Sequence, residues 1–527
     1  MGHAVIPAPT RFDAGGGREF TFQPGTAVRY ADAGVAPIVE RFCSQITRRT
    51  GLRLAPEAGH PAPDEPSVTI ELAAGAELGS LPAPAGVSPA GQGAADERYS
   101  LVIDGGQVVV RAREPVGVAR GLTTLMQVVA MTPSASTEKI RLPGARILDA
   151  PRYAWRGLSL DLARTFFTVS EVRRVIDLLE LYKLNVLHLH LTDDQSWRLP
   201  VGRPTGRPES GAPFYSGEDL GALVAYAADR FVTVVPEVDT PGHASALLQL
   251  HPELHTGRNE VEVELAPGHR HRTVWLDPEL PATFELIGQV LAGVAAIFPG
   301  PYIHIGGDEP YGMPQDLYAS YVERLRRLVR ALGRRPLGWQ ESARAGLGSD
   351  DIIQYWFTDI ALPPSLSPQV RAQMDADLAL SHRDVQTAAA VPVPVIVSPL
   401  SHCYLDVPYA EPSADPAQAD RQGRLGLRVY TPQTVAESFD WEPAEALGPG
   451  RSAQVAGIEA AIWAETISGF DDLSFLLLPR LAGVAHRAWS GPQLASWTGH
   501  RDRLARHGRL WAQDDLTYFR TSTVDWL

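Results

Sequence analysis

The sequence predicts an α/β protein in which a (β/α)8 barrel follows a smaller α+β domain. The chain has 527 residues, too many for one ordinary core, whereas an α/β barrel takes about 250 residues or more as one domain. Up to about residue 150 the pattern alternates with period two, and beyond that point short apolar runs alternate with helical patterns. We therefore expect two domains, with the barrel second.

Residues 1–150 are expected to form the smaller domain. The segments 67–72 and 98–112 alternate between apolar and polar residues, and the second contains a Gly-Gly pair typical of a hairpin turn. A helical pattern follows over residues 115–129. The stretch 73–95 is rich in Ala, Gly and Pro, so we expect a mobile loop there.

Residues 151–494 are expected to form the barrel. Its predicted strands are 157–162, 186–191, 232–236, 302–305, 336–339, 352–355, 395–398 and 455–462. Its predicted helices include 170–182, 217–229, 281–297 and 315–332. The stretch 361–394 is irregular, so one barrel helix is expected to be missing there or replaced by loops. In the tail, 495–527, residues 495–511 predict an amphipathic helix packed on the barrel.

Composition excludes some classes of partner. The net charge of −14 argues against a nucleic acid or an anionic membrane, because both require basic patches. No run approaches the roughly 18 apolar residues of a membrane span. The first twenty residues contain no apolar core of a signal peptide, so we expect a cytoplasmic protein. Cys43 and Cys403 are expected to be two reduced thiols.

Acidic and aromatic side chains recur where the predicted strands end, which is where barrel enzymes place their chemistry. They are Asp161, Arg164, His188, His190, Asp193, Asp194, Trp197, Glu237, Asp239, His243, Asp308, Glu309, Trp339, Glu341, Trp356, Tyr404, Asp406, Trp463 and Glu465. A single Asp after a strand is usually a helix cap, and a single buried Trp usually belongs to the core. Recurrence at nearly every strand end instead favours a pocket for a sugar, which has apolar C–H faces and a rim of hydroxyls.

The strand ends also carry a family resemblance. The segments "GLSLDLARTFF", "KLNVLHLHLTDDQSWRL", "VVPEVDTPGHA", "YIHIGGDEP", "GWQE", "QYW", "SHCYLD" and "AAIWAET" appear in that order. Together they resemble glycoside hydrolase family 20, the β-N-acetylhexosaminidases, over the whole barrel. Residues 97–129 also resemble the α+β domain that precedes the barrel in this family.

The resemblance implies hydrolysis of terminal β-linked N-acetylglucosamine or N-acetylgalactosamine from an amino-sugar oligosaccharide or glycoconjugate, with no cofactor and no metal. It implies that the acetamido oxygen of the substrate is the nucleophile, an exception to the usual pair of carboxylates. Glu309 is then the general acid and base, and Asp308 holds the acetamido N–H. Asp193 and His243 support the acid, although Asp194 is an alternative to Asp193.

The remaining roles implied by the resemblance concern substrate binding. Arg164 binds the ring hydroxyls O3 and O4, and Asp406 and Glu465 bind O6 and O4. Tyr404 binds the acetamido carbonyl. The acetamido methyl is enclosed by three tryptophans: Trp339, Trp356 and Trp463. The segments 203–214 and 268–275 depart from what the family leads us to expect, and the first lies near the exit of the leaving group.

Two other interpretations use the same residues. In a metal-dependent hydrolase, the two histidines of "HLH" with Asp193, His243 and Asp308 would be ligands, which leaves Glu309 and the tryptophans without a role. In a non-catalytic carbohydrate-binding barrel, the intact Asp308–Glu309 pair would have no purpose, because binding needs no general acid. Preference between gluco and galacto sugars stays open; short imported oligosaccharides are the expected substrates.

Overall fold

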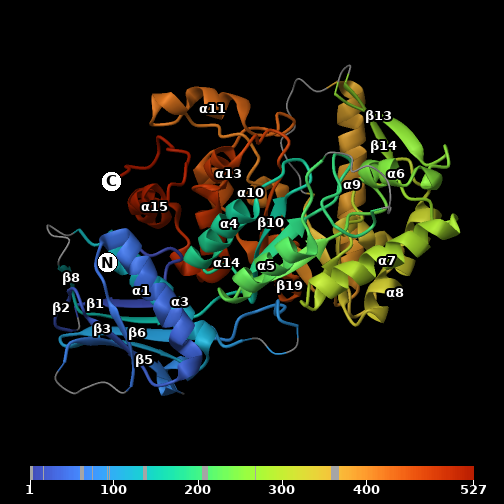
Figure 1. Ribbon diagram of the computed structural model, residues 1–527. Coiled ribbons are helices and arrows are strands. Elements are labelled where there is room, and N and C mark those ends of the chain that lie inside the picture. Colours follow the sequence, from blue (N-terminus) through green and yellow to red (C-terminus); the bar gives the residue numbers. More distant parts are fainter. Residues whose placement is uncertain are drawn as a thin grey trace.

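The protein was analysed as a computed structural model that describes residues 4–15, 17–59, 65–73, 75–91, 93, 95–133, 139–203, 212–266, 269–357 and 367–527. An N-terminal sheet domain lies beside a barrel whose helices surround a closed ring of strands (Figure 1). The C-terminal helix α15 (Trp497–Gln513) lies above the N-terminal helices in that view. Cys43 and Cys403 are both free and buried.

The N-terminal domain is built on a seven-stranded sheet. Its order is β1 (Arg11–Ala14), β9 (Ala145–Asp149), β6 (Tyr99–Asp104), β7 (Gln107–Ala112), β5 (Ser67–Leu72), β3 (Ala27–Tyr30) and β4 (Ala55–Ala58). A two-stranded sheet joins β2 (Phe20–Phe22) to β8 (Ile140–Leu142). Strands β6 and β7 pair antiparallel from Asp104 opposite Gln107, which confirms the predicted hairpin. The main helices are α1 (Ala36–Thr50) and α3 (Pro115–Met131).

The barrel closes through eight parallel strands and confirms the predicted fold class. They are β10 (Trp155–Asp161), β11 (Val186–His190), β12 (Thr233–Glu237), β15 (Tyr302–His304), β16 (Arg335–Trp339), β17 (Ile352–Tyr355), β18 (Val395–Val397) and β19 (Val455–Ile462). Strand β19 pairs with β10 and thereby closes the ring. All eight strands are buried, as expected of β-strands covered by helices on one side and by each other on the other.

Helices surround the strands. They are α4 (Val169–Leu181), α5 (Gly217–Ala228), α6 (Ser245–Leu250), α7 (Pro281–Ile297), α8 (Gln315–Ala331), α9 (Pro368–Ala390), α10 (Leu400–Cys403), α11 (Ala419–Arg424), α12 (Val435–Phe439), α13 (Phe470–Leu477) and α14 (Arg480–Trp489). Helices α4 and α5 each begin with a capping box, at Thr168 with Glu171 and at Ser216 with Asp219. Among the described residues, no helix combines the length and the apolar composition needed to cross a membrane.

The expectation of a missing helix in 361–394 is wrong, because α9 occupies Pro368–Ala390; residues 361–366 lie outside the described part of the chain. Its packing face explains the error. Ser381 donates to the carbonyl of Phe357 at 2.8 Å, and Asp384 forms an ion pair with Arg344 at 2.9 Å. At the α9 positions whose side chains are described, the buried residues are Ser381, Asp384 and Ala388, so polar or small residues stand where an apolar period of 3.6 residues would reveal a helix.

The segments 203–214 and 268–275 were unfamiliar in the sequence. In the second, His269–Val274 forms strand β14, which pairs antiparallel with β13 (Glu260–Ala266), so this segment is half of a hairpin rather than a loop. Gly268 and most of the first segment, residues 204–211, lie outside the described residues. The hairpin stands at the edge of the molecule beside α6 and the end of α9 (Figure 1).

The stretch 73–95 is anchored where we expected a mobile loop. It contains the short helix α2 (Ala76–Gly79), and its residue Val87 donates its N–H to the carbonyl of Ala456 at 3.0 Å. Tyr302 donates to the carbonyl of Ser88 at 2.8 Å. At Gly86 a Cβ atom would lie 1.9 Å from the carbonyl oxygen of Ala456, so only glycine permits this approach. The segment therefore covers the amino-terminal end of the barrel.

Buried charges join the two domains. Lys183, which follows α4, has a fully buried side chain whose Nζ lies 2.9 Å from Asp149 Oδ2 and donates to the Tyr99 hydroxyl at 2.8 Å. The indole of Trp489 on α14 donates to the other oxygen of Asp149 at 3.0 Å. On α15, Trp511 donates to the Tyr182 hydroxyl at 2.7 Å. Each of these buried groups therefore has a polar partner that replaces water.

Lys183→Met should destabilise the protein by about 3–5 kcal/mol, because it leaves the Asp149 carboxylate buried without its cation. Lys139→Met is the matched control: Lys139 is the only other lysine and is exposed, so its loss should change stability by less than about 0.5 kcal/mol. Urea denaturation measures both. Equal effects of the two substitutions would show that the Lys183–Asp149 pair does not stabilise the interface.

Candidate active site

A cavity of about 90 Å³ opens where the barrel strands end. Its lining residues are Arg164, His190, Asp193, Asp239, His243, Asp308, Glu309, Trp356, Tyr404, Leu427, Tyr430, Trp463 and Glu465. The structure thus brings to this cavity every residue for which the family resemblance implies a catalytic or binding role except Trp339 and Asp406, which lie behind the wall. Closure of the barrel explains this convergence, because parallel strands present their carboxyl ends at the same rim.

Asp308 and Glu309 follow β15 after two glycines in the left-handed region. At Gly306, with φ of 66°, an added Cβ would lie 1.7 Å from Asp239 Oδ1, so a side chain is excluded there. Asp308 is buried, and its Oδ1 has no hydrogen-bond partner among the described residues. The side chain of Glu309 is 35% exposed. The turn therefore presents one buried and one accessible carboxylate to the same cavity.

The surroundings of Asp308 shift its pKa. Burial raises the pKa of Asp308 well above its ordinary value, and the neighbouring carboxylate of Asp239 raises it further, while His243 opposes both. His243 Nε2 lies 3.7 Å from Asp308 Oδ2 and 3.7 Å from Glu309 Oε2. One imidazole thus faces both carboxylates of the pair.

Asp193, rather than Asp194, is the carboxylate that supports His243. Its Oδ1 lies 3.2 Å from His243 Nδ1, whereas Asp194 is 3.9 Å away. Asp194 instead accepts hydrogen bonds from the backbone and hydroxyl of Ser245. Asp193 is also 2.8 Å from Arg164 Nη2. Burial would raise the pKa of Asp193, but His243 and Arg164 hold it well below its ordinary value.

Arg164 links several carboxylates at one side of the cavity. Its guanidinium lies 3.4 Å from Asp161 and 3.9 Å from Glu465, and it lies over the Trp463 ring at 5.4 Å. Its buried Nε has no hydrogen-bond partner among the described residues. Burial raises the pKa of Glu465, while Arg164 opposes that shift. A fixed cation beside a carboxylate suits the recognition of hydroxyl groups, which both donate and accept.

Aromatic rings form another wall. Trp356 stacks parallel to Tyr404 with centroids 6.0 Å apart, and Trp463 meets Tyr404 edge-on at 6.0 Å. Trp339 is 1% exposed and packs 6.1 Å from Trp463, so it supports the wall from behind. Asp406 is also buried; its Oδ1 accepts the backbone N–H of Trp463 at 3.4 Å, and its Oδ2 has no partner among the described residues.

Four lining residues were given no role from the family resemblance: His190, Asp239, Leu427 and Tyr430. Asp239 was visible at a strand end, and its burial raises its pKa to about 7 although His243 lowers it. Leu427 and Tyr430 lie between β18 and β19 in a segment without a strand, so no strand end marked them.

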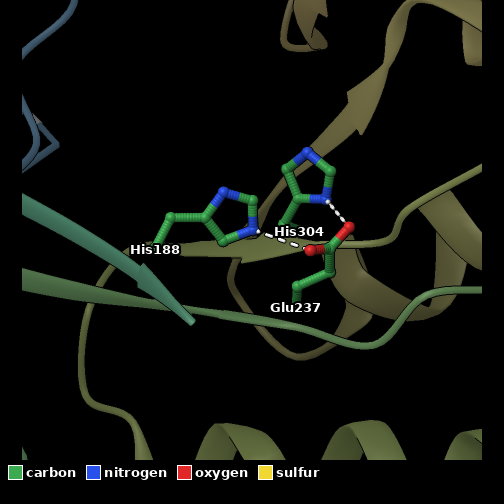
Figure 2. A group of neighbouring side chains, drawn as sticks. All are labelled: His188, Glu237 and His304. Carbon is green, nitrogen blue, oxygen red and sulfur yellow. Dashed lines mark ion pairs between the residues drawn. The ribbon is translucent and has the colours of Figure 1, made fainter. Parts of the chain in front are cut away.

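Among the described residues, four groups of acidic and imidazole side chains lie close enough to hold a metal ion. His188, Glu237 and His304 lie inside the barrel, where the Glu237 oxygens are 3.1 Å from His188 Nε2 and 3.0 Å from His304 Nδ1 (Figure 2). The carboxylate lies between the two rings, so these groups already interact with one another. The other three groups lie at or beside the cavity: His190 with Asp193 and Asp239, Asp193 with Asp194 and His243, and Asp239 with His243 and Asp308.

Comparisons with known proteins match both the N-terminal domain and the barrel. The model of the glycosyl hydrolase family 20 catalytic domain matches residues 153–313 and 310–492, and the model of domain 2 of that family matches residues 2–150. A beta-N-acetylhexosaminidase of Cellulomonas fimi is 36% identical over 442 residues, which cover 82% of this chain and 82% of that protein.

Solved structures agree over the full length. A beta-N-acetylhexosaminidase from Streptomyces coelicolor A3(2) matches with a TM-score of 0.79 and 31% identity, covering 100% of this chain and 99% of that one. A mutant beta-hexosaminidase of Streptomyces plicatus in complex with product GlcNAc matches with a TM-score of 0.81 and 30% identity, covering 100% and 98%.

Asp193→Asn should lower the pKa of His243 toward its ordinary value of 6.5, because it removes the nearest of the carboxylates that raise that pKa against the effect of burial. Asp194→Asn, the same chemical change at the neighbouring residue, should leave the pKa nearly unchanged. NMR titration of the imidazole measures both. A larger fall in the Asp194 variant would reverse the assignment.

Proposed function

The chain belongs to glycosyl hydrolase family 20, and from that premise we propose that it is a retaining exo-β-N-acetylhexosaminidase. It removes terminal β-linked N-acetylglucosamine or N-acetylgalactosamine, with the acetamido group of the substrate as nucleophile. The main support for the proposal is the environment of Asp308. A buried carboxylate oxygen without a partner, beside an accessible acid, is what an acetamido N–H and a glycosidic oxygen require.

In the first step, the acetamido oxygen attacks the anomeric carbon while the glycosidic C–O bond breaks. Glu309 gives its proton to the departing oxygen, and a cationic oxazolinium ring remains. In the second step, Glu309 takes a proton from water as that water attacks the anomeric carbon and the ring opens. Two inversions at the same carbon retain the configuration.

The two carboxylates can be neighbours in sequence because neither attacks the sugar. A classical retaining pair stands about 5–5.5 Å apart on opposite faces of the bond. Here Glu309 acts at the leaving oxygen, and Asp308 acts at the nitrogen of the acetamido group. The 3.7 Å contacts of His243 with both suit a group that adjusts the pair together, with Asp193 fixing the imidazole.

Binding follows from the walls of the cavity. Tyr404 is suited to donate to the acetamido oxygen, and Trp356 and Trp463 to enclose the methyl group, with Trp339 behind them. Arg164 and Glu465 are suited to the O3 and O4 hydroxyls. Asp406 reaches O6 only if its partnerless Oδ2 becomes accessible when the sugar enters. Because these contacts hold the acetamido oxygen in line with the anomeric carbon, substrate binding lowers the entropic part of the barrier to the reaction.

The two rival interpretations make different predictions in one assay. Turnover of an aryl N-acetylglucosaminide by the wild-type protein excludes a carbohydrate-binding protein without activity. Retention of that turnover after dialysis against EDTA excludes a metal-dependent hydrolase built on the cavity carboxylates. Absence of turnover on both gluco and galacto aryl glycosides would contradict the proposed function.

Asp308→Asn should lower kcat by about 10²–10³-fold while KM changes little, because the carboxylate stabilises charge that develops on the acetamido nitrogen only as the ring forms. Asp194→Asn is the control, since Asp194 is bonded to Ser245 and does not line the cavity. Steady-state kinetics on an aryl N-acetylglucosaminide measure both. A rise in KM alone for the Asp308 variant would assign it to ground-state binding.

A further inference from the structure

A chain of alternating carboxylates and imidazoles crosses the interior of the barrel. It runs through Glu459, His188, Glu237, His190, Asp193 and His243, and we call it the acid–imidazole chain. Consecutive contacts measure 2.8, 3.1, 2.6, 2.9 and 3.2 Å. The side chains of all but the last are at most 1% exposed. Its last three residues, His190, Asp193 and His243, line the cavity, and the others extend from there into the core.

Glu237 is the branch point of this chain. Its Oε2 contacts His190 Nδ1 at 2.6 Å and His188 Nε2 at 3.1 Å. Its Oε1 accepts the indole N–H of Trp339 at 2.8 Å and lies 3.0 Å from His304 Nδ1 (Figure 2). One carboxylate therefore holds Trp339, which backs the aromatic wall, and His190, which contacts the Asp193 that supports His243.

We propose that Glu237, which lines no part of the cavity, is a positioning residue for the reaction. This inference rests on the proposed function. Through Trp339, Glu237 fixes the wall against which the acetamido group must lie. Through His190 and Asp193, it fixes the imidazole of His243 that faces Asp308 and Glu309. A single buried carboxylate thus aligns the nucleophile and the acid, the two groups that must act together.

The second nitrogen of His190 explains why the charge of Glu237 matters. His190 contacts Glu237 through Nδ1 and Asp193 through Nε2, so it must carry a proton on both nitrogens to donate to both carboxylates. An anion at Glu237 favours that cation: burial would lower the pKa of His190, but Glu237 and Asp193 raise it well above its ordinary value. A neutral amide at position 237 removes the negative charge that favours this cation, so the charge-assisted contact between position 237 and His190 is weakened.

Glu459 provides a matched comparison. It is also fully buried, accepts an indole N–H, from Trp155 at 2.8 Å, and contacts an imidazole, His188 at 2.8 Å. It differs in location, because Trp155 packs with the cluster at the amino-terminal end of the barrel and lines no part of the cavity. A purely structural role predicts similar consequences at Glu237 and Glu459, whereas positioning predicts a difference.

The experiment compares Glu237→Gln with Glu459→Gln in the full chain. Both are expected to lower the urea midpoint of unfolding, since each leaves a buried imidazole without its carboxylate. On an aryl N-acetylglucosaminide, Glu237→Gln should lower kcat by about 10–100-fold with less than about 3-fold change in KM, as expected for misalignment of reacting groups. Glu459→Gln, once shown to be folded by circular dichroism, should retain kcat within about 3-fold of wild type.

The single variant Trp339→Phe tests the indole arm separately and replaces the first test if Glu237→Gln does not fold; a double-mutant cycle is measured where both fold. Trp339→Phe keeps a ring but removes the N–H that Glu237 accepts, and it should lower kcat by about 10-fold. Where both variants fold, the loss in the double variant should be smaller than the product of the single losses, because they remove one shared contact. Unchanged kcat in Trp339→Phe, independent losses, or equal losses in the Glu237 and Glu459 variants would overturn the inference. Failure of the wild-type protein to turn over the substrate would overturn the proposed function, and this inference with it.

Discussion

Carboxylate and imidazole side chains inside the barrel must be buried together, because each needs a partner of opposite charge when water is removed. The barrel interior holds Glu237, Glu459, His188, His190 and His304, all in a region from which water is excluded. Isolated ions there would be prohibitively unstable. Alternation of carboxylate and imidazole solves the problem, because each ion has neighbours of the opposite sign at 2.6–3.1 Å. The cavity is the place where this pairing stops.

At the cavity, several buried polar atoms have no hydrogen-bond partner among the described residues and can bind a substrate. Asp308 Oδ1, Asp406 Oδ2 and Arg164 Nε are buried and have no hydrogen-bond partner among the described residues. Such groups destabilise a folded protein, and native structures keep them mostly where a ligand completes them. Stability and function are therefore opposed at this rim. The interface around Lys183 and Asp149 shows the fully paired condition in a region with no ligand.

Much of this arrangement could be predicted from the sequence, because short β-branched runs set the strands and the strand ends carried the chemistry. Strand β19 begins and ends at the predicted residues, and Asp308 and Glu309 lie at the cavity as expected. Helix α9 was missed because its packing face is polar. The sequence does not predict which side chains are close in space. Asp193 and Asp194 are neighbours in the chain, and which of them contacts His243 depends on how the turn after β11 directs each side chain.

The sequence also did not predict which site residues line the cavity and which lie behind its wall. Trp339 and Asp406 carry the same sequence signal as Trp356 and Glu465, yet the first two lie behind the wall and the last two on it. Tyr430 lies on the wall although it follows no strand. A motif predicts which residue types lie at the rim of the barrel, whereas side-chain packing determines which of them line the cavity and which lie behind its wall. The role of Glu237 emerges only from that layering.

The central claim is that the acetamido oxygen of the substrate is the nucleophile. The most direct measurement is kcat/KM for a series of aryl glycosides whose N-acetyl group carries none, one, two or three fluorine atoms. Fluorine withdraws electrons from the acetamido oxygen, so kcat/KM should fall progressively along the series, by about tenfold for each 1.4 kcal/mol added to the barrier. A protein carboxylate acting as nucleophile would leave kcat/KM nearly constant along the series, and that result would contradict the account.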